Sequence, residues 1–296
     1  MLFDSAPGPV FRPPSEAHSL IIRLTLGCSH NQCAFCSMYK GVTFQRRSLA
    51  EIHTLIENAA KYYPDSRRIF LADGDALCLP TDELLEVLAT LREKFPKLQR
   101  VTSYTTPQDL LSKSVEELTS LKEAGLQMLY LGLETGSDLL LKEIRKGATS
   151  AQMIEGCKKV KDAGIKLSVM VILGLGGQEH SEEHARETAK VASQISPTYL
   201  SALSLMLHPG TELRRKAEKG EFTPLSPYEM MGELAETLTQ IKPESPIIFR
   251  ASHPSNFAML SGTLPKDQAR LIQEAKDAQN DLQNYRTPSF NDHGRF

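Results

Sequence analysis

Residues 19–36 read SLIIRLTLGCSHNQCAFC, a stretch that joins an apolar run to a cysteine motif. The run Leu20–Leu26 is suited to a buried parallel strand. Directly after it, Cys28, Cys33 and Cys36 follow a C-x4-C-x2-C spacing, on what is then the first strand-to-helix loop. Three thiolates on one loop can reach a single metal centre. The stretch therefore predicts a strand whose carboxyl end leads into a metal site.

The alternation of strand and helix continues along the chain. The helical pattern after Ser48 begins with a capping box that uses Glu51, and two later helices end at Gly125 and Gly164, where glycine suits the left-handed conformation. Such alternation implies right-handed crossovers and a parallel sheet with helices outside. Capping boxes are also expected at Ser114 with Glu117 and at Thr149 with Gln152. Five further strands are expected at Arg68–Ala72, Val101–Tyr104, Gln127–Leu133, Lys166–Leu173 and Thr198–Leu205.

Six strand-helix units are fewer than the eight of a closed barrel, so the expected fold class is α/β, with a partial (β/α)6 TIM-like barrel over residues 19–212. A doubly wound flat sheet is the alternative, and in both folds the loops after the strands form the site. Residues 1–18 are rich in proline, which predicts an extended N-terminal arm. Residues 213–296 are expected to form a C-terminal extension that closes the barrel and contributes to the substrate site.

The composition favours a cytoplasmic protein with no membrane contact. The 296 residues are 41% hydrophobic and 24% charged, which suits one large domain or a domain with an appendage. A formal net charge of -2 gives no global basic surface, so a nucleic-acid partner is disfavoured. No run of about eighteen apolar residues and no signal-peptide pattern is present in the sequence. Five cysteines are too few for a disulfide framework in a chain of this length.

Two kinds of metal centre fit the cysteine loop. Cysteine thiolates are the standard ligands of iron-sulfur clusters, and three of them leave one iron of a [4Fe-4S] cluster free for another ligand. The three cysteines with His30 are equally a legitimate ligand set for structural zinc. Three unrelated core thiols are a poor explanation because residues 29–32 are polar. The spacing alone leaves the cluster and zinc both open.

The cysteine loop resembles that of the radical S-adenosylmethionine (SAM) superfamily, in which an aromatic residue, here Phe35, precedes the third cysteine. The superfamily's usual spacing is C-x3-C-x2-C, and the extra residue here is similar to the elongator-type tRNA-modifying members. The resemblance covers about residues 19–210 and identifies no subfamily. It implies a partial (β/α)6 barrel, a [4Fe-4S] cluster on Cys28, Cys33 and Cys36, anaerobic chemistry, and an electron donor such as flavodoxin or ferredoxin.

The resemblance also implies which residues bind SAM. Asp73, Gly74 and Asp75 match a motif whose backbone receives the methionine amino group. Glu134 resembles the carboxylate that grips the ribose hydroxyls, and Gly174 lies in a segment similar to the one along the adenine. Without the family, Asp73 is equally well explained as a helix cap in an ordinary turn. The other expected cofactor contacts are Phe35, Tyr104 and Ser168.

The expected reaction is reductive cleavage of SAM to a 5′-deoxyadenosyl radical that removes hydrogen from a small-molecule substrate. Arg250, His253 and Asn256, after the apolar run Ile247–Phe249, supply donors for an anionic or carbonyl-bearing molecule. A surface turn explains the same segment equally well. The alternative functions are a tRNA-modifying radical enzyme and a non-catalytic barrel stabilised by zinc.

Four other residues of the chemically active types are explained more simply by structure than by catalysis. Cys157 has helical spacing from apolar neighbours and is expected to be a core thiol. Cys78 stands between two leucines, so packing explains it better than catalysis. Arg145 and Lys146 are able to pair with an anionic group, but they end a helix, where basic side chains usually complement the helix dipole.

Overall fold

The computed structural model of the chain describes residues 3–282. Residues 1–2 and 283–296, at the ends of the expected arm and of the expected extension, lie outside the described residues. The strands are β1 (Leu20–Arg23), β2 (Thr25–Leu26), β3 (Gln45–Arg46), β4 (Arg68–Ala72), β5 (Arg100–Thr105), β6 (Leu126–Glu134), β7 (Lys166–Leu173), β8 (Tyr199–Ser204), β9 (Ile247–Ala251) and β10 (Leu260–Leu264). The helices are η1 (Pro14–Glu16), α1 (Leu49–Tyr62), η2 (Ala76–Cys78), α2 (Thr81–Lys94), α3 (Pro107–Ser112), α4 (Val115–Ala124), α5 (Asp138–Glu143), α6 (Ser150–Asp162), α7 (Gly177–Ile195), α8 (Glu212–Glu218), α9 (Pro227–Gln240) and α10 (Gln268–Asp281).

The main sheet has eight strands in the order β1-β4-β5-β6-β7-β8-β9-β10. This order follows the chain, without the reversal that defines a doubly wound fold, so the partial barrel is confirmed and the alternative is wrong. The sheet has two strands more than the six expected. Strand β9 pairs in parallel with β8, and β10 pairs antiparallel with β9. The apolar run Ile247–Phe249 indicated β9, whereas β10 reads LSGTL and has no such run.

The chain packs as two compact units, each of which is described by itself. The first contains Met1–Gln32, Met38–Leu131 and Glu155–Ser168, and the second contains Cys33–Ser37, Gly132–Ile154 and Val169–Phe296. Strands β6 and β7 each have residues in both units. The expected division at residues 18 and 212 follows the order of the chain and stays a prediction.

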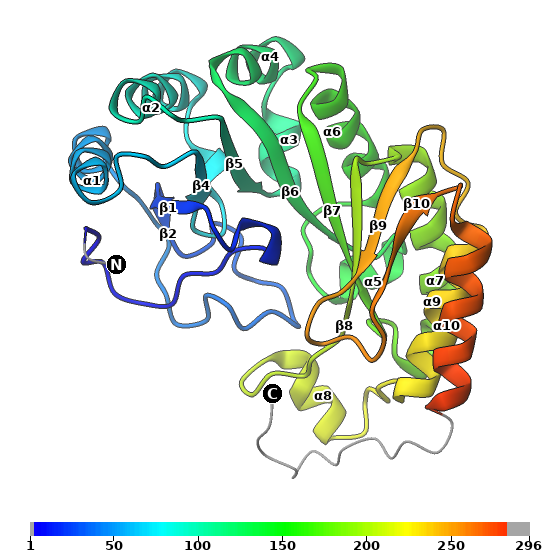
Figure 1. Cartoon of the computed structure of the whole chain (residues 1–296). Helices are drawn as coiled ribbons and strands as arrows, with labels where there is room; N and C mark the ends of the chain where they lie inside the picture. Colours follow the sequence, from blue (N-terminus) through cyan, green and yellow to red (C-terminus); the bar gives the residue numbers. More distant parts are fainter. Residues whose placement is uncertain (1–2, 283–296) are drawn as a thin grey trace. The chain divides into compact units, whose positions relative to one another are not determined.

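In the first unit, β1, β4 and β5 are parallel neighbours, and α1, α2 and α4 stand in a row on their outer side (Figure 1). Helix α1 starts at the expected capping box of Ser48 and Glu51, in which both reciprocal hydrogen bonds are present. Its buried side chains recur at helical spacing, because the apolar stripe must cover the sheet. They are Ile52, Leu55, Ile56 and Ala59.

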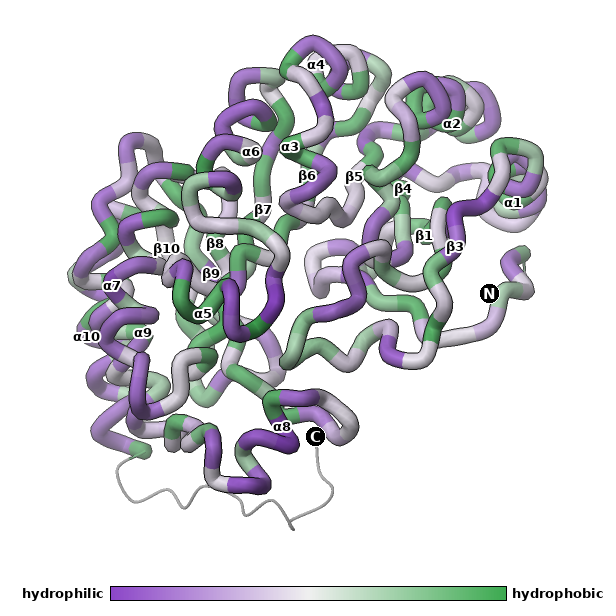
Figure 2. Tube along the Cα trace, turned by 180° about the vertical axis from the view of Figure 1, so that it is seen from behind, coloured by the Kyte–Doolittle hydropathy of each residue, from purple (hydrophilic) through white to green (hydrophobic). Residues whose placement is uncertain are grey.

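In the second unit, α7, α9 and α10 pack together beside β8, β9 and β10 (Figure 1). Side chains of β9 alternate between the two faces of the sheet, so Phe249 is buried while Arg250 is exposed. The helices of both units carry polar and apolar stretches in turn (Figure 2). Helix α9 begins after Ser226, whose side chain accepts from the amide of Glu229 in a capping box. Within residues 3–282, no helix combines the length and the apolar composition that crossing a membrane requires. The cytoplasmic location stays a prediction.

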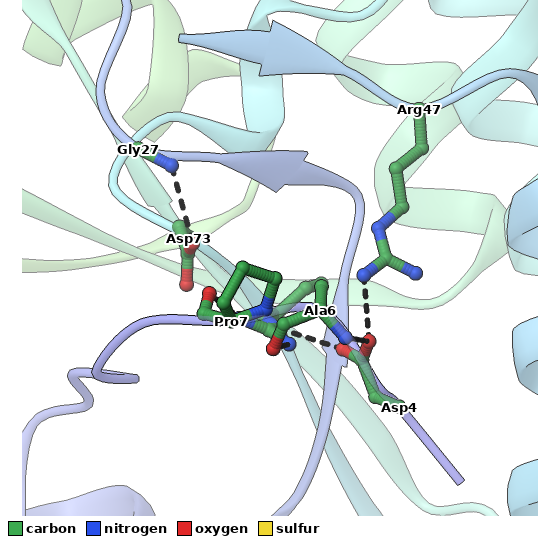
Figure 3. Close-up of polar contacts among 7 residues, drawn as sticks. Asp4, Ala6, Pro7, Gly27, Arg47 and Asp73 are labelled. Atoms are coloured by element: carbon green, nitrogen blue, oxygen red, sulfur yellow. Dashed lines mark hydrogen bonds and ion pairs between the residues drawn. The ribbon is translucent and has the colours of Figure 1, made fainter. Parts of the chain in front are cut away.

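The N-terminal arm is anchored to the first unit by two buried carboxylates. Asp4 lies 2.6 Å from Nε of Arg23 and 2.6 Å from a terminal guanidinium nitrogen of Arg47 (Figure 3). Glu16, which is fully buried, accepts hydrogen bonds from Arg100 at 2.9 Å and from the hydroxyl of Tyr130 at 2.6 Å. These contacts fix the arm at both of its ends.

We expect Asp4→Asn to destabilise the fold by about 3–5 kcal/mol at neutral pH, because it leaves the buried Arg23 without its counter-charge. Burial alone would raise the pKa of Asp4, but hydrogen bonds from Arg23 and Arg47 outweigh it and hold the pKa below its ordinary value of 3.8. The stabilisation is therefore present above that value and is lost as the pH falls through the lowered pKa. Urea unfolding at several pH values measures both effects.

The matched control is Asp65→Asn, which breaks an exposed ion pair with Lys97. We expect this control to change the free energy of unfolding by less than about 1 kcal/mol. Equal stability of Asp4→Asn and the wild type at pH 7 would show that the anchor does not hold the arm.

Candidate functional site

The five cysteines form no disulfide and differ in exposure. Cys28, in the first unit, Cys33 and Cys36, in the second, and Cys78 are partly exposed. Cys157 is fully buried, which confirms a core thiol. Burial, followed by the nearby charge of Asp75, raises the pKa of Cys78 to about 12, so this thiol stays protonated at neutral pH. Among residues 3–282, no three His, Cys, Asp or Glu side chains are assembled into a metal site.

The loop after β4 packs closely on Cys28 at Gly74. A Cβ atom at position 74 would lie 3.0 Å from Cβ of Cys28 and 2.6 Å from a ring carbon of Tyr39. Only glycine fits this space without displacing the tyrosine ring or the cysteine. The loop after β1 and the loop after β4 are thus brought together in the first unit. The sequence motif predicted that the backbone at Gly74 approaches the methionine amino group of SAM, and that contact stays a prediction.

Two aspartates beside Gly74 carry buried oxygen atoms that have no hydrogen-bond partner within the described residues. Asp73 accepts a hydrogen bond from the amide of Gly27 at 3.2 Å (Figure 3), and Asp75 accepts one from the hydroxyl of Ser29. In each carboxyl group the other oxygen, Oδ1, is unpaired. Burial raises the pKa of Asp73 to about 6, and burial together with Asp109 raises the pKa of Asp75 to about 9. The unpaired oxygen of Asp73 is a buried acceptor, which is costly and points to a missing donor.

In the second unit, Glu134 occupies a strained position at the end of β6. Its φ angle is 65°, in the left-handed region that glutamate rarely adopts, and its side chain is almost buried. The carboxylate folds back over Gly132, where a Cβ atom would lie 2.0 Å from Oε1 of Glu134. Strain of this kind persists where the surrounding structure holds one conformation for a function.

Lys146 is the partner of Glu134. Its Nζ lies 2.8 Å from Oε1 of Glu134, and both side chains are about nine-tenths buried. Burial lowers the pKa of Lys146, but the charges of Glu134, Cys33 and Cys36 outweigh this and raise it above the ordinary value. An anionic partner for Lys146 was one of two interpretations of the sequence, but Glu134 was not identified as that partner, because nothing in the sequence links two residues that meet only after the chain turns back. Arg145 pairs separately with Glu212.

The remaining expected cofactor contacts lie in several environments. Phe35 packs on the apolar cluster of Ile144, Leu175 and Leu213, which holds the end of the cysteine loop in the second unit. Gly174 has a φ of 78° and donates its amide to Glu233 at 2.6 Å. In the first unit, Tyr104 stands edge-on to Phe70, with ring centroids 5.0 Å apart, and Ser168 is buried. Their contact with SAM stays a prediction.

The three expected substrate residues have different surroundings. Arg250 is exposed and stacks over the ring of Tyr199, 5.5 Å from its centroid. His253 is partly buried, and its Nδ1 lies 2.8 Å from the hydroxyl of Ser255. Asn256 uses its amide on the backbone of β8, accepting from Ser204 and donating to Ala202, both at 2.8 Å. Asn256 thus ties the turn to the sheet, as the surface-turn explanation requires.

The family model described as "Radical SAM superfamily" matches residues 22–191, which is more than half of the chain. The chain is 24% identical over 174 residues to heme chaperone HemW of Bacillus subtilis, a match that covers 58% of this chain and 45% of that protein. It is 26% identical over 190 residues to tRNA-2-methylthio-N(6)-dimethylallyladenosine synthase of Dehalococcoides mccartyi, covering 62% and 44% respectively. The chain thus spans about half the length of these curated relatives.

Among solved structures, methylornithine synthase (PylB) superposes with a TM-score of 0.55, covering 87% of this chain and 69% of that one. At 16% identity this likeness supports the fold alone. The family model supplies what the structural likeness does not, because it covers the strands and loops on which the expected cofactor residues lie. The chain therefore belongs to the radical SAM superfamily, whose enzymes use a [4Fe-4S] cluster and SAM.

Proposed function

We propose that this enzyme cleaves SAM reductively and uses the radical to remove a hydrogen atom from a small organic substrate that carries an anionic group. The observation that carries the proposal is the loop of three partly exposed cysteines that form no disulfide, with Gly74 packed against Cys28. When bound there, the cluster supplies the electron that releases methionine and the 5′-deoxyadenosyl radical. The electron would come from a small donor such as flavodoxin or ferredoxin.

The cluster would be held by the thiolates of Cys28, Cys33 and Cys36. The donor set fits, because the family uses three cysteines and these three are partly exposed and form no disulfide. Lys146 interacts electrostatically with Cys33 and Cys36, so its positive charge would offset part of the negative charge of the cluster and its ligands. A purely structural zinc site is no longer an alternative, since members of this family use an iron-sulfur cluster.

SAM would be held by two kinds of group in the site: a buried acceptor without a hydrogen-bond donor, and a carboxylate that an ion pair holds in place. The unpaired Oδ1 of Asp73 and the backbone beside Gly74 would receive the amino group of the methionine moiety. Glu134, fixed by Lys146, would accept hydrogen bonds from the two ribose hydroxyls. Gly174 would lie along the adenine, with Phe35, Asp75, Tyr104 and Ser168 around the cofactor.

The anionic group of the substrate would bind at Arg250. In the register of the sheet, Arg250 of β9 lies between Ser201 of β8 and Ser261 of β10. No carboxylate partner of Arg250 is present among the described residues, and its guanidinium is exposed. Arginine flanked by hydroxyl groups is suited to a carboxylate or phosphate. His253 would lie at the edge of this site. Asn256 is not included in the proposed substrate site, because its side-chain amide is hydrogen-bonded to the backbone of β8.

The test is the formation of 5′-deoxyadenosine by anaerobic, cluster-loaded enzyme with a reductant. We expect slow uncoupled formation, and a faster rate with the fraction of small anionic metabolites that contains the substrate. Arg250→Ala and His253→Ala should keep the cluster, SAM binding and the uncoupled rate but lose the stimulation. Arg186→Ala, which removes an exposed arginine of α7, is the matched control and should behave as the wild type. Full stimulation of both substrate variants would disprove the site at Arg250.

Modification of tRNA is the second candidate function. It is supported by the extra residue in the cysteine spacing and by the similarity to a tRNA-2-methylthio-N(6)-dimethylallyladenosine synthase. The net charge of -2 therefore does not support the exclusion of nucleic acid that it suggested. The same assay separates the candidates, because stimulation by total tRNA that ribonuclease removes would favour tRNA over a small molecule.

A further inference from the structure

Glu233 of α9 is a buried carboxylate with no place in the functions described above. It is 4% exposed, and it accepts hydrogen bonds from the amide of Gly174 at 2.6 Å and from the hydroxyl of Ser181 at 2.5 Å. Burying a carboxylate is unfavourable unless donors satisfy it. These donors come from the loop after β7 and from α7, so Glu233 fixes the position of Gly174 from outside the loop.

His184 of α7 extends this contact to the end of β6. It is 1% exposed, and its Nε2 lies 3.6 Å from Oε1 of Glu233. Its Nδ1 lies 2.8 Å from the hydroxyl oxygen of Thr135, the residue after Glu134. Either Nδ1 of His184 or the hydroxyl of Thr135 can donate in this hydrogen bond, so both neutral tautomers keep the contact. Thr135 is itself fully buried, and its hydroxyl oxygen accepts the amide of Ser137 at 3.1 Å.

The amide of Gly174 and the side chains of Glu233, His184 and Thr135 form one buried series of contacts. It joins the loop after β7 to the loop after β6. Of the expected SAM contacts, Gly174 lies in the loop after β7, and Glu134 is the last residue of β6, directly before the other loop. The carboxylate that joins them, Glu233, lies on α9, in the C-terminal extension. We propose that Glu233 and His184 are positioning residues, which hold Glu134 and Gly174 at the spacing that SAM requires and make SAM affinity depend on the extension. This inference rests on the proposed roles of Glu134 and Gly174 in SAM binding.

Calorimetric SAM binding to the oxidised, cluster-loaded enzyme tests the inference without turnover. We expect Glu233→Ala and His184→Ala each to raise the Kd by about tenfold, the lower end of what removing an orienting partner costs at metal sites. Glu233→Gln should restore part of the affinity, because its amide oxygen can still accept from Gly174. The control is Glu236→Ala, on the exposed side of the same helix, which should leave the Kd unchanged.

A double mutant separates positioning from a general loss of stability. The double mutant combines Glu233→Ala with Glu134→Ala. If Glu233 acts by positioning Glu134, the double mutant should raise the Kd by less than the product of the two separate effects. An unchanged Kd for Glu233→Ala and His184→Ala beside a weakened Glu134→Ala would overturn the inference and leave the proposed function standing. An unchanged Kd for Glu134→Ala would instead refute the proposed role of Glu134 in SAM binding, while 5′-deoxyadenosine formation tests the proposed function itself. Should Glu233→Ala not fold, Glu233→Gln and His184→Gln serve, and wild-type affinity in both would overturn the inference.

Discussion

Changing Cys28, Cys33 or Cys36 singly to alanine is expected to remove most of the iron from the protein. Wild-type enzyme, reconstituted without oxygen, should contain about four iron and four sulfide per chain, because three thiolates hold a [4Fe-4S] cluster. Two remaining thiolates leave the cluster exposed to loss, so each variant should be nearly colourless. Iron and sulfide analysis and the visible absorption of the cluster measure the effect, which should also abolish 5′-deoxyadenosine formation.

Cys157→Ala is the control, since this thiol is fully buried and outside the motif. It should keep the iron of the wild type, as should Cys78→Ser, because the raised pKa of Cys78 keeps it in the thiol form. A protein that holds one zinc per chain and no sulfide would contradict the assignment of the cysteines. If only one of the three alanine variants kept its full iron content, the cysteine replaced in that variant would not be a cluster ligand, and a different side chain would hold that iron.

The fold could be read from the sequence wherever local chemistry decided the structure. The capping boxes at Ser48, Ser114 and Thr149 are all present, and Gly125 and Gly164 both adopt positive φ angles. These features depend on residues three or four positions apart. Strand β10 was missed because its sequence is mostly small and polar, and it becomes a strand only by pairing with β9. Partners far along the chain decide such an edge strand.

The site shows the same division between local and distant signals. The turn at Gly174 followed from a sequence motif, because glycine marks positions that other residues cannot take. The packing of Gly74 on Cys28 and Tyr39 was not predicted. The partners of the acidic residues could not be predicted from the sequence. Lys146 reaches Glu134 from twelve positions away, and Glu233 reaches Gly174 from fifty-nine. A helical pattern does not record which side chain Lys146 or Glu233 meets in the folded unit.

Glu134→Ala is expected to weaken SAM binding by tenfold or more, which corresponds to at least about 1.4 kcal/mol. The change removes an acceptor for the ribose hydroxyls, and it also leaves the ammonium group of Lys146, nine-tenths buried, without its counter-charge. Glu134→Gln, which keeps an acceptor oxygen and loses the charge, should lie between alanine and the wild type. Calorimetry with cluster-loaded protein measures the affinity.

Two further measurements make the Glu134 result specific. The iron content of Glu134→Ala should equal that of the wild type, because the carboxylate is not a cluster ligand in the proposed site. Glu143→Ala removes an exposed carboxylate at the end of α5 and should leave the Kd unchanged. If SAM bound to Glu134→Ala as tightly as to the wild type, the strained position of this residue would need another explanation. A φ of 65° at a glutamate is costly to maintain, and holding an acceptor toward the ribose is the reason that the family's chemistry offers.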